Sequence, residues 1–382
     1  MRRILSTFLL TMITTLALAD ERTDVIILGN NPSAMAAGIQ SARSGVKTTW
    51  ISPTAMKAEF SLSDTLNGKT GIWAELLKHV KANPETPGEQ LLKGFTDTIR
   101  NLTIIQNGIR KIERAGKGWE VKLINGRELK CQVLVDAENH IKLFDKAPET
   151  LSQQIGPAAM PSNLYSNRLY RTSISTGQEI IPLASLISKE ENYIVAPSKS
   201  SVPASILAGQ AAGASAAYCA YFKTTTRHLS IRMTQGELLR YSGTLLPATD
   251  VQQSDTGFIS IQHILATGIM KLQNGAFNPE KTLNSEELRL PMKEFYSRSQ
   301  LWFFNNKKDT LTIQDAVNLI MFTANRGEEL RREIDKGWIS SLKLTGVYDP
   351  KRAITRRELA VLIDRYLQPF SVRVDFVGNL LR

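Results

Sequence analysis

Apolar runs of two kinds open the chain and predict alternating strands and helices. The short β-branched run Thr23–Leu28 ends at Gly29 and predicts a buried strand. The small-residue stretch from Ser33 to Ser44 predicts a helix packed on a sheet, and Val46–Ser52 predicts a second strand. A strand, a glycine turn, a helix and a strand in this order indicate an α/β fold with a Rossmann-like domain.

The pattern changes after residues 247–257, a polar stretch that we interpret as a linker. Beyond it, Phe277–Leu288 aligns without gaps on Tyr348–Leu359, and residues 311–317 look like a third, eroded copy. Each copy reads as a loop followed by a capped helix. The repeat therefore predicts a small all-helical domain over residues 258–382, after a first domain over residues 20–246.

The repeated helices begin with polar residues that predict capping boxes. In this motif an N-cap side chain bonds the backbone three residues on, and an acidic side chain at that position bonds back. The predicted pairs are Asn284 with Glu287, Thr312 with Asp315, and Thr355 with Glu358.

The first residues have the three parts of a secretory signal peptide. Met1–Arg3 is basic, Ile4–Leu16 is apolar, and Ala17–Ala19 has the small residues of a cleavage site. The alternative is an ordinary first helix or strand. We expect cleavage of residues 1–19 and an extracytoplasmic location, periplasmic or secreted. N-terminal sequencing of the mature protein should begin at Asp20, and a cytoplasmic product that retains Met1 would contradict this.

Charge and composition exclude some partners. The net charge is +11, but no Lys/Arg block with interleaved aromatic residues appears, so nucleic-acid binding has no support. A mildly basic surface suits an anionic polymer or ligand. After the N-terminal region no apolar run is long enough for a membrane span.

The cysteines and histidines predict no metal site. Cys131 and Cys219 are too few for a disulfide scaffold or a four-cysteine zinc site. One bridge between them is conceivable, but both lie in apolar runs, which favours buried free thiols. The four histidines are scattered along the chain without metal-ligand spacing.

The turn after the first strand is the candidate cofactor site, because helix N-terminal amides attract a pyrophosphate. Its candidate residues are Gly29, Asn31, Pro32, Ser33 and Ala34. The G-x-G-x-x-G pattern is incomplete, since Asn31 and Ala34 replace its second and third glycines. Asparagine tolerates the left-handed backbone, but its side chain crowds the phosphate approach.

The second strand ends in a serine, whose hydroxyl is a weaker hydrogen-bond partner than the carboxylate of the usual pattern. Ser52 stands where an acid usually binds the ribose 2′-hydroxyl, and it is the remaining candidate of this unit. A strand–helix–strand unit that binds nothing is the alternative.

Several motifs in family order resemble the FAD-dependent oxidoreductase family that includes xanthan-lyase-like proteins. They cover roughly residues 23–246 and lie at residues 24–29 with 45–46, 63–75, 121–137, 181–186 with 191–196, and 203–217. The last is similar to the family's L-G-Q-A-A-G-T-A-A-A helix. The resemblance implies FAD, with the pyrophosphate at the turn and the flavin near Gly209, Gln210 and Gly213. It also places Asp136, in the segment similar to D-A-T-G, among the cofactor-binding residues.

Departures from the family pattern leave two functions open. Residues 54–60 replace a Gly-Gly loop, Glu138 and Asn139 replace T-G, an Arg before Pro203 is missing, and the insert between His140 and Ile181 is short. One function is an exported FAD-dependent oxidoreductase whose substrate, a small molecule or sugar, is unknown. The other is a non-catalytic descendant that has lost FAD and serves as a wall-associated binding or scaffold protein. No catalytic residue is identified, and His140 is either functional or a turn histidine.

The helical repeat resembles the S-layer homology domain. Thr355–Glu358 looks like its T-R-A-E motif. The resemblance implies binding of an acidic cell-wall polymer through Arg356, whose equivalents in the other copies are Ser285 and Ile313. A domain that only packs, with a solvated Arg356, is the alternative.

Overall fold

The computed structural model describes residues 21–56, 70–86, 88–144, 164–165, 167–177, 180–199 and 201–381. The predicted signal peptide, most of the motif at residues 63–75 and part of the segment at residues 54–60 lie outside these ranges.

The first unit contains the strands and five helices of the described residues. Its strands are β1 (Glu21–Arg22), β2 (Val25–Leu28), β3 (Thr48–Ser52), β4 (Leu102–Gln106), β5 (Ile109–Ala115), β6 (Gly118–Leu123), β7 (Glu128–Cys131), β8 (Val133–Asp136), β9 (Ser173–Ser175), β10 (Ile180–Pro182) and β11 (Tyr193–Val195). Its helices are α1 (Pro32–Arg43), α2 (Gly71–Ala82), α3 (Gly88–Asp97), α4 (Val202–Tyr221) and α5 (Ile231–Arg240).

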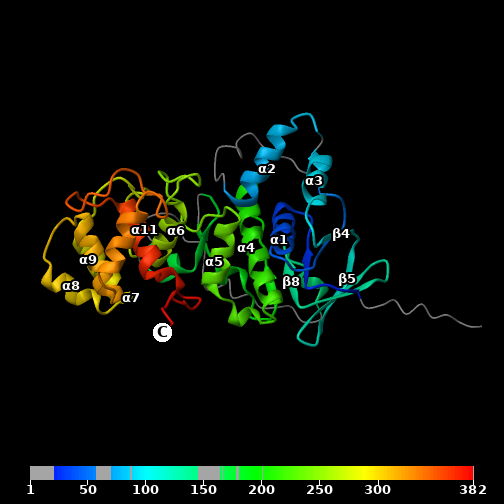
Figure 1. Cartoon of the computed structure of the whole chain (residues 1–382). Coiled ribbons are helices and arrows are strands. Elements are labelled where there is room, and N and C mark those ends of the chain that lie inside the picture. The colour runs from blue at the N-terminus through cyan, green and yellow to red at the C-terminus, as the bar shows by residue number, and fades with distance from the viewer. Residues whose placement is uncertain are drawn as a thin grey trace, which may run out of the picture.

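The second unit is helical, as its sequence repeat predicts. Its helices are α6 (Phe258–Thr267), α7 (Ser285–Phe295), α8 (Ser299–Asn305), α9 (Ile313–Ala324), α10 (Glu328–Gly337) and α11 (Arg356–Leu367). Short 3₁₀ turns lie at Ile141–Leu143, Arg168–Arg171, Leu183–Leu186, Thr226–His228 and Pro369–Ser371. In Figure 1 the two units lie next to each other along the molecule.

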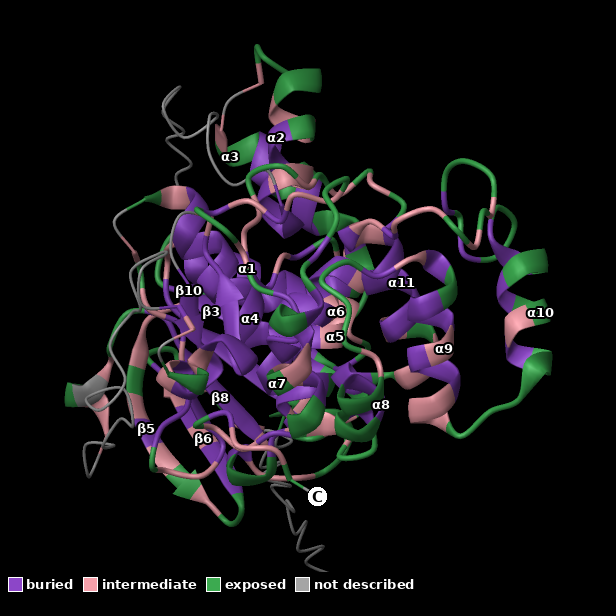
Figure 2. Cartoon of the chain, turned by 90° about the vertical axis from the view of Figure 1, so that its left-hand side faces the viewer, coloured by how far each residue is buried: buried purple, intermediate pink, exposed green. Residues whose placement is uncertain are grey.

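A five-stranded parallel sheet in the order β11-β8-β2-β3-β4 forms the centre of the first unit. Alternate residues of β2 enter two cores: Val25 and Ile27 pack with α1 and α4, whereas Ile26 and Leu28 pack with the sheet β1-β7-β6-β5. Both faces are covered, which explains why the strand reads as a continuous apolar run. Figure 2 shows α1 and α4 as buried almost throughout. The prediction of a Rossmann-like α/β fold is confirmed.

The three repeat copies are joined in a ring. The first residue of each capped helix donates its N–H to the loop of the next copy: Ser285 to Asp309 O at 2.9 Å, Ile313 to Arg352 O at 2.9 Å, and Arg356 to Lys281 O at 2.8 Å. Each acceptor lies three residues before the N-cap of its own copy. The predicted equivalence of Ser285, Ile313 and Arg356, and with it the eroded third copy, is therefore confirmed.

Two of the three predicted capping boxes form, at Thr312–Asp315 and Thr355–Glu358. The third is wrong: Asn284 accepts from Glu286 N, and the Glu287 carboxylate lies 3.6 Å from Nη1 of Arg356 instead. A buried guanidinium is a stronger attraction for that carboxylate than its own N-cap amide.

The two units share their cores across the predicted linker. Phe258, Ala266 and Phe370 of the helical unit pack into the core of the first unit, whereas Tyr170 and Leu246 pack into the helical core. A cut near Asp255 would therefore expose buried residues of both cores. A polar linker sequence does not show which buried surfaces flank it.

Buried polar groups reinforce this contact. Arg232 of α5 donates hydrogen bonds to Arg171 O at 3.2 Å, to Ala266 O at 3.3 Å and to Val372 O at 3.4 Å. Burial lowers the pKa of Arg232 to about 9. Cys131 and Cys219 are buried free thiols, as predicted, and burial raises the pKa of each to about 12. Within the described ranges, no helix has the length and hydropathy to cross a bilayer, and no cluster of metal-ligating side chains occurs.

Candidate functional site

The crossover in the parallel sheet marks the expected ligand site. From β2 the chain builds β3 and β4 on one side of the sheet and then returns to place β8 on the other. Open α/β sheets bind ligands in the crevice at the carboxyl ends of the strands where this reversal occurs. Here that crevice lies between Gly29, which follows β2, and Ala137, which follows β8.

The turn into α1 has the predicted course but an unexpected role for Asn31. Gly29 has a φ of +131°, whereas Asn31 is extended with a φ of −140°. The idea that Asn31 supplies a left-handed residue is therefore wrong. Asn31 is the N-cap of α1: its Oδ1 accepts from Ala34 N at 2.9 Å, and its Nδ2 donates to Ala137 O at 2.8 Å. Pro32 follows as the first helical residue.

A carboxylate of the chain itself lies in the crevice. Asn30 N donates to Oε1 of Glu138 at 2.5 Å. A Cβ atom on Gly29 would lie 3.1 Å from Cγ of Glu138, so the Glu138 side chain packs directly on the glycine turn. The neighbouring Asn139 has a φ of +61°, a left-handed conformation that favours glycine. Glu138 thus presents a negative charge where an α/β nucleotide-binding fold receives a phosphate.

Asp136 holds the base of this segment in place. Its buried carboxylate accepts hydrogen bonds from His140 N at 2.7 Å, Tyr193 Oη at 2.8 Å and Glu138 N at 3.1 Å, and lies 2.7 Å from His140 Nδ1. Burial alone would raise the pKa of Asp136, but the bonds from His140 and Tyr193 hold that pKa below its usual value. With these four contacts, the Asp136 carboxylate anchors the loop that carries Glu138.

His140 is the basic partner of the two carboxylates in this cluster. Burial alone would lower its pKa, but the hydrogen bond to Asp136 and the charges of Asp136 and Glu138 raise the pKa above its ordinary value. Nε2 lies 3.8 Å from Oε2 of Glu138. The histidine ring therefore lies between the carboxylates of Asp136 and Glu138 at the carboxyl edge of the sheet.

We expect this pair to give the protein a defined dependence of stability on pH. The raised pKa of His140 stabilises the fold below about pH 6.5, and this contribution disappears as the pH rises through the folded-state pKa. The lowered pKa of Asp136 stabilises the fold above about pH 3.9, and this contribution disappears as the pH falls. The free energy of unfolding of wild type minus that of His140→Gln should therefore shrink steadily above pH 6.5. A difference that stays constant with pH would contradict the charged pair.

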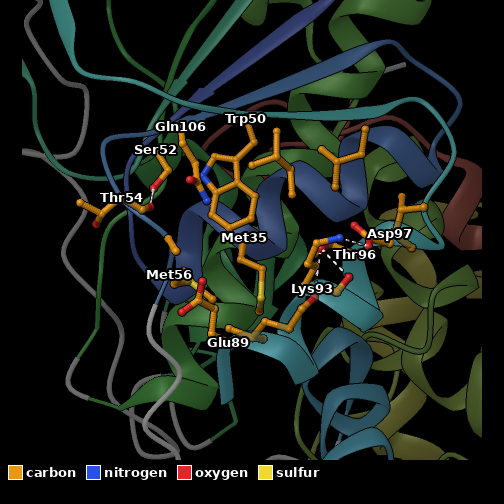
Figure 3. A pocket seen from close by; sticks show the side chains of 15 residues that line it. Met35, Trp50, Ser52, Thr54, Met56, Glu89, Lys93, Thr96, Asp97 and Gln106 are labelled. Carbon is orange, nitrogen blue, oxygen red and sulfur yellow. Dashed lines mark hydrogen bonds and ion pairs between the residues drawn. The ribbon is translucent and has the colours of Figure 1, made fainter. Parts of the chain in front are cut away.

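Ser52 does not point toward a ligand. Its hydroxyl donates to Thr54 O at 2.5 Å. It borders a cavity of about 430 Å³ between β3, β4 and α3, whose wall also includes Trp50 (Figure 3). Trp50 Nε1 donates to Gly29 O at 2.7 Å, and Asn30 Nδ2 donates to Thr54 Oγ1 at 2.7 Å. These bonds lie between the cavity and the crevice.

The residues of α4 predicted to lie near the flavin, Gly209, Gln210 and Gly213, contact neighbouring helices. A Cβ atom on Gly209 would lie 2.1 Å from Ser33 O, and one on Gly213 would lie 2.4 Å from Ala37 O. Gln210 is 1% exposed; its Oε1 accepts from Ile72 N at 3.1 Å and its Nε2 donates to Gln40 Oε1 at 3.0 Å. Gly209 thus lies beside the turn at Ser33, whereas the Gln210 side chain is used in hydrogen bonds to α2 and α1.

Arg356 is buried in the helical unit. It is 1% exposed, and its guanidinium donates to Phe277 O at 2.6 Å and to Lys271 O at 2.7 Å. Its Cζ lies 4.8 Å from the centre of the Phe277 ring. The alternative prediction that Arg356 is solvated is therefore wrong. Its contacts favour a role in packing between the repeat copies. Polymer binding through Arg356 stays a prediction.

Reasoning from sequence missed Glu138 and Tyr193 as parts of this site. The signal for Glu138 was present, because it stands at the threonine of the D-A-T-G pattern. A motif comparison shows that the threonine is absent, but not what the glutamate contacts. Tyr193 lies 57 residues from Asp136 along the chain and reaches it only because β11 pairs with β8.

FAD does not fit the crevice with Glu138 in this position. Two unit negative charges 4 Å apart repel by about 4 kcal/mol at an effective dielectric constant of about 20. Two other atoms favour a bound ligand. Ser33 Oγ and Asn30 Oδ1 are buried without a hydrogen-bond partner among the described residues. The turn therefore keeps two polar atoms without partners, while the Glu138 carboxylate beside it would repel a pyrophosphate.

The comparisons with known proteins find similar solved structures over about a third of the chain. No protein-family model matches the chain, and no curated protein matches it. Among solved structures, GidA from Aquifex aeolicus has 17% identity over 31% of this chain and 25% of its own, with a TM-score of 0.24. A thioredoxin reductase from Gloeobacter violaceus has 19% identity over 31% of this chain and 34% of its own, with a TM-score of 0.21.

A third similar structure is the bacillithiol disulfide reductase Bdr (YpdA) from Staphylococcus aureus. Its identity is 15% over 31% of this chain and 38% of its own, with a TM-score of 0.22. This chain therefore matches well under half the length of each of the three proteins. The fold assignment rests on the order of the parallel strands, and no activity follows from these matches.

Proposed function

We propose that this protein is a non-catalytic descendant of the FAD-dependent oxidoreductase fold that binds no flavin and serves outside the cytoplasm as a binding or scaffold protein. The observation that carries the proposal is the Glu138 carboxylate on Asn30 N at the helix N-terminus. The positive end of the α1 dipole, which would receive a pyrophosphate, is already next to an anion.

The surroundings of Glu138 support the same function. Asp136 and His140 anchor the loop on which Glu138 stands, so the carboxylate is supported by a buried network. Both ends of the Asn31 side-chain amide are used within the chain: the amide accepts from Ala34 N and donates to Ala137 O. Export rests on the signal-like residues 1–19, and a wall-associated role rests on the resemblance of the helical repeat.

A second candidate is the exported FAD-dependent oxidoreductase. It is favoured by two buried atoms at the turn where a pyrophosphate would bind: Ser33 Oγ and Asn30 Oδ1 have no hydrogen-bond partner among the described residues. Binding would require Glu138 to leave Asn30. The two candidates therefore differ in whether FAD is present in the purified protein.

The absorbance spectrum of the purified protein separates these candidates. We expect no band at about 450 nm, where a flavin absorbs and side chains do not, and no flavin released on heating. A flavoenzyme purified from the same cells under the same conditions serves as the positive control. Flavin at an equimolar level with the protein would overturn the proposal and establish the oxidoreductase candidate as a flavoprotein.

A further inference from the structure

The parallel sheet ends in β4, and no other described strand pairs with its outer edge. β4 pairs with β3 on one side and, within the described part of the chain, with no strand on the other. Natural edge strands usually carry a charged residue, a proline or a bulge that prevents further pairing. β4 has the sequence Leu-Thr-Ile-Ile-Gln and pairs with β3 in unbroken register, so it has none of these.

The backbone of β4 offers hydrogen bonds at alternate residues. At the two ends of the ladder, Asn101 O accepts from Thr48 N and Asn107 N donates to Ser52 O. Residues that face the neighbour alternate with residues that face away, so the N–H and C=O groups of Leu102, Ile104 and Gln106 point outward. No described residue bonds to them outside the sheet.

The 430 Å³ cavity lies beside this edge (Figure 3). The side chains of Leu102, Ile104 and Gln106 form one wall, and α3 forms the opposite wall with residues that include Leu92. Ile104 is 39% exposed. A strand added to β4 would direct every second side chain to this face of the sheet, between β4 and α3. Backbone groups and a side-chain cavity together are the two parts of a strand-addition site.

The charges at the cavity rim indicate which peptide it suits. Lys93 pairs with Asp97, whereas Glu89 is exposed and has no partner among the described residues. Among the described residues of the rim, Glu89 and Asp97 outnumber Lys93, so this part of the rim is net negative on a protein whose net charge is +11. A lysine or arginine on the incoming strand would meet Glu89. A second copy of β4 brings no basic residue within the strand.

We propose that β4 binds an extended peptide segment of another protein as an added strand, with an apolar side chain in the cavity and a basic side chain at Glu89. The contact uses only the outer edge of β4 and the groove against α3.

A display library of random peptides, selected on the full chain, supplies the probe. We expect enriched peptides to alternate apolar residues and to contain a lysine or arginine. Hydrogen exchange then locates the site: a bound peptide should slow exchange at the amides of Leu102, Ile104 and Gln106. The amides of Thr103 and Ile105 face β3 and should be protected with or without peptide.

Variants and modified peptides test the mode of binding. Ile104→Pro removes an outward N–H without touching the β3 ladder and should weaken binding by about tenfold or more, whereas the matched Ile104→Val should bind normally. If Ile104→Pro fails to fold, the selected peptide with alternate backbone nitrogens methylated tests the same point on wild type. One methylation register should abolish binding and the other should spare it. Glu89→Lys should select against basic peptides.

Three results would overturn the proposal. The first is a library from which no peptide is enriched. The second is a bound peptide that leaves exchange at Leu102, Ile104 and Gln106 unchanged. The third is protection of these amides that rises with protein concentration in the absence of peptide, which would assign the edge to a second copy of the chain.

Discussion

Replacing Glu138 by alanine should convert the crevice into an anion site. The backbone amide of Asn30 would then be free to bind a ligand, with the dipole of α1 behind it. The repulsion removed is at most about 4 kcal/mol. Because the Glu138 side chain is 32% exposed and screened by solvent, we expect FAD and inorganic pyrophosphate to bind about tenfold or more tightly than to wild type.

Titrations followed by flavin fluorescence and by calorimetry measure this gain. Glu138→Gln is the matched control, since it keeps the shape of the side chain and removes its charge. If charge excludes the ligand, glutamine and alanine should both improve binding; if bulk excludes it, only alanine should. Unchanged affinity in both variants would show that Glu138 is not what closes the crevice.

Gly209→Ala should destabilise the protein by about 3 kcal/mol, because the new methyl group would meet backbone and not a flexible side chain. The Cβ position lies 2.1 Å from Ser33 O, where α4 packs on α1. The helices must separate to accept the methyl group, and every residue packed between them and the sheet loses contact. Gly213→Ala, with its Cβ position 2.4 Å from Ala37 O, should act in the same way.

Gly236→Ala is the matched control for these substitutions. Gly236 is also a helical glycine, in α5, but nothing lies within 4 Å of its Cβ position. Alanine there should raise stability by up to about 1 kcal/mol through its higher helix propensity. Urea unfolding of the three variants measures the differences. Equal effects at Gly209 and Gly236 would mean that close backbone approach is not why α4 carries glycines.

The local structure of the chain was determined by its sequence. Thr23–Leu28 predicted β2, and the stretch from Ser33 to Ser44 predicted α1, because strand and helix periods and turn residues act over a few residues. The repeat predicted which residues are equivalent in the helical unit, and the ring of bonds from Ser285, Ile313 and Arg356 bears this out. Two capping boxes followed for the same reason, since each joins groups three residues apart.

The chemistry of the crevice was decided only by the tertiary structure. Glu138 meets Asn30 across 108 residues of chain, and Tyr193 meets Asp136 because two strands happen to be neighbours in the sheet. Gln210 and Arg356 match motif positions, yet packing directs both inward, to Ile72 N and to Phe277 O. Where a side chain points depends on the elements that surround it. A pattern along the chain can therefore predict where a phosphate-binding turn forms, but not whether a carboxylate from a distant loop already occupies it.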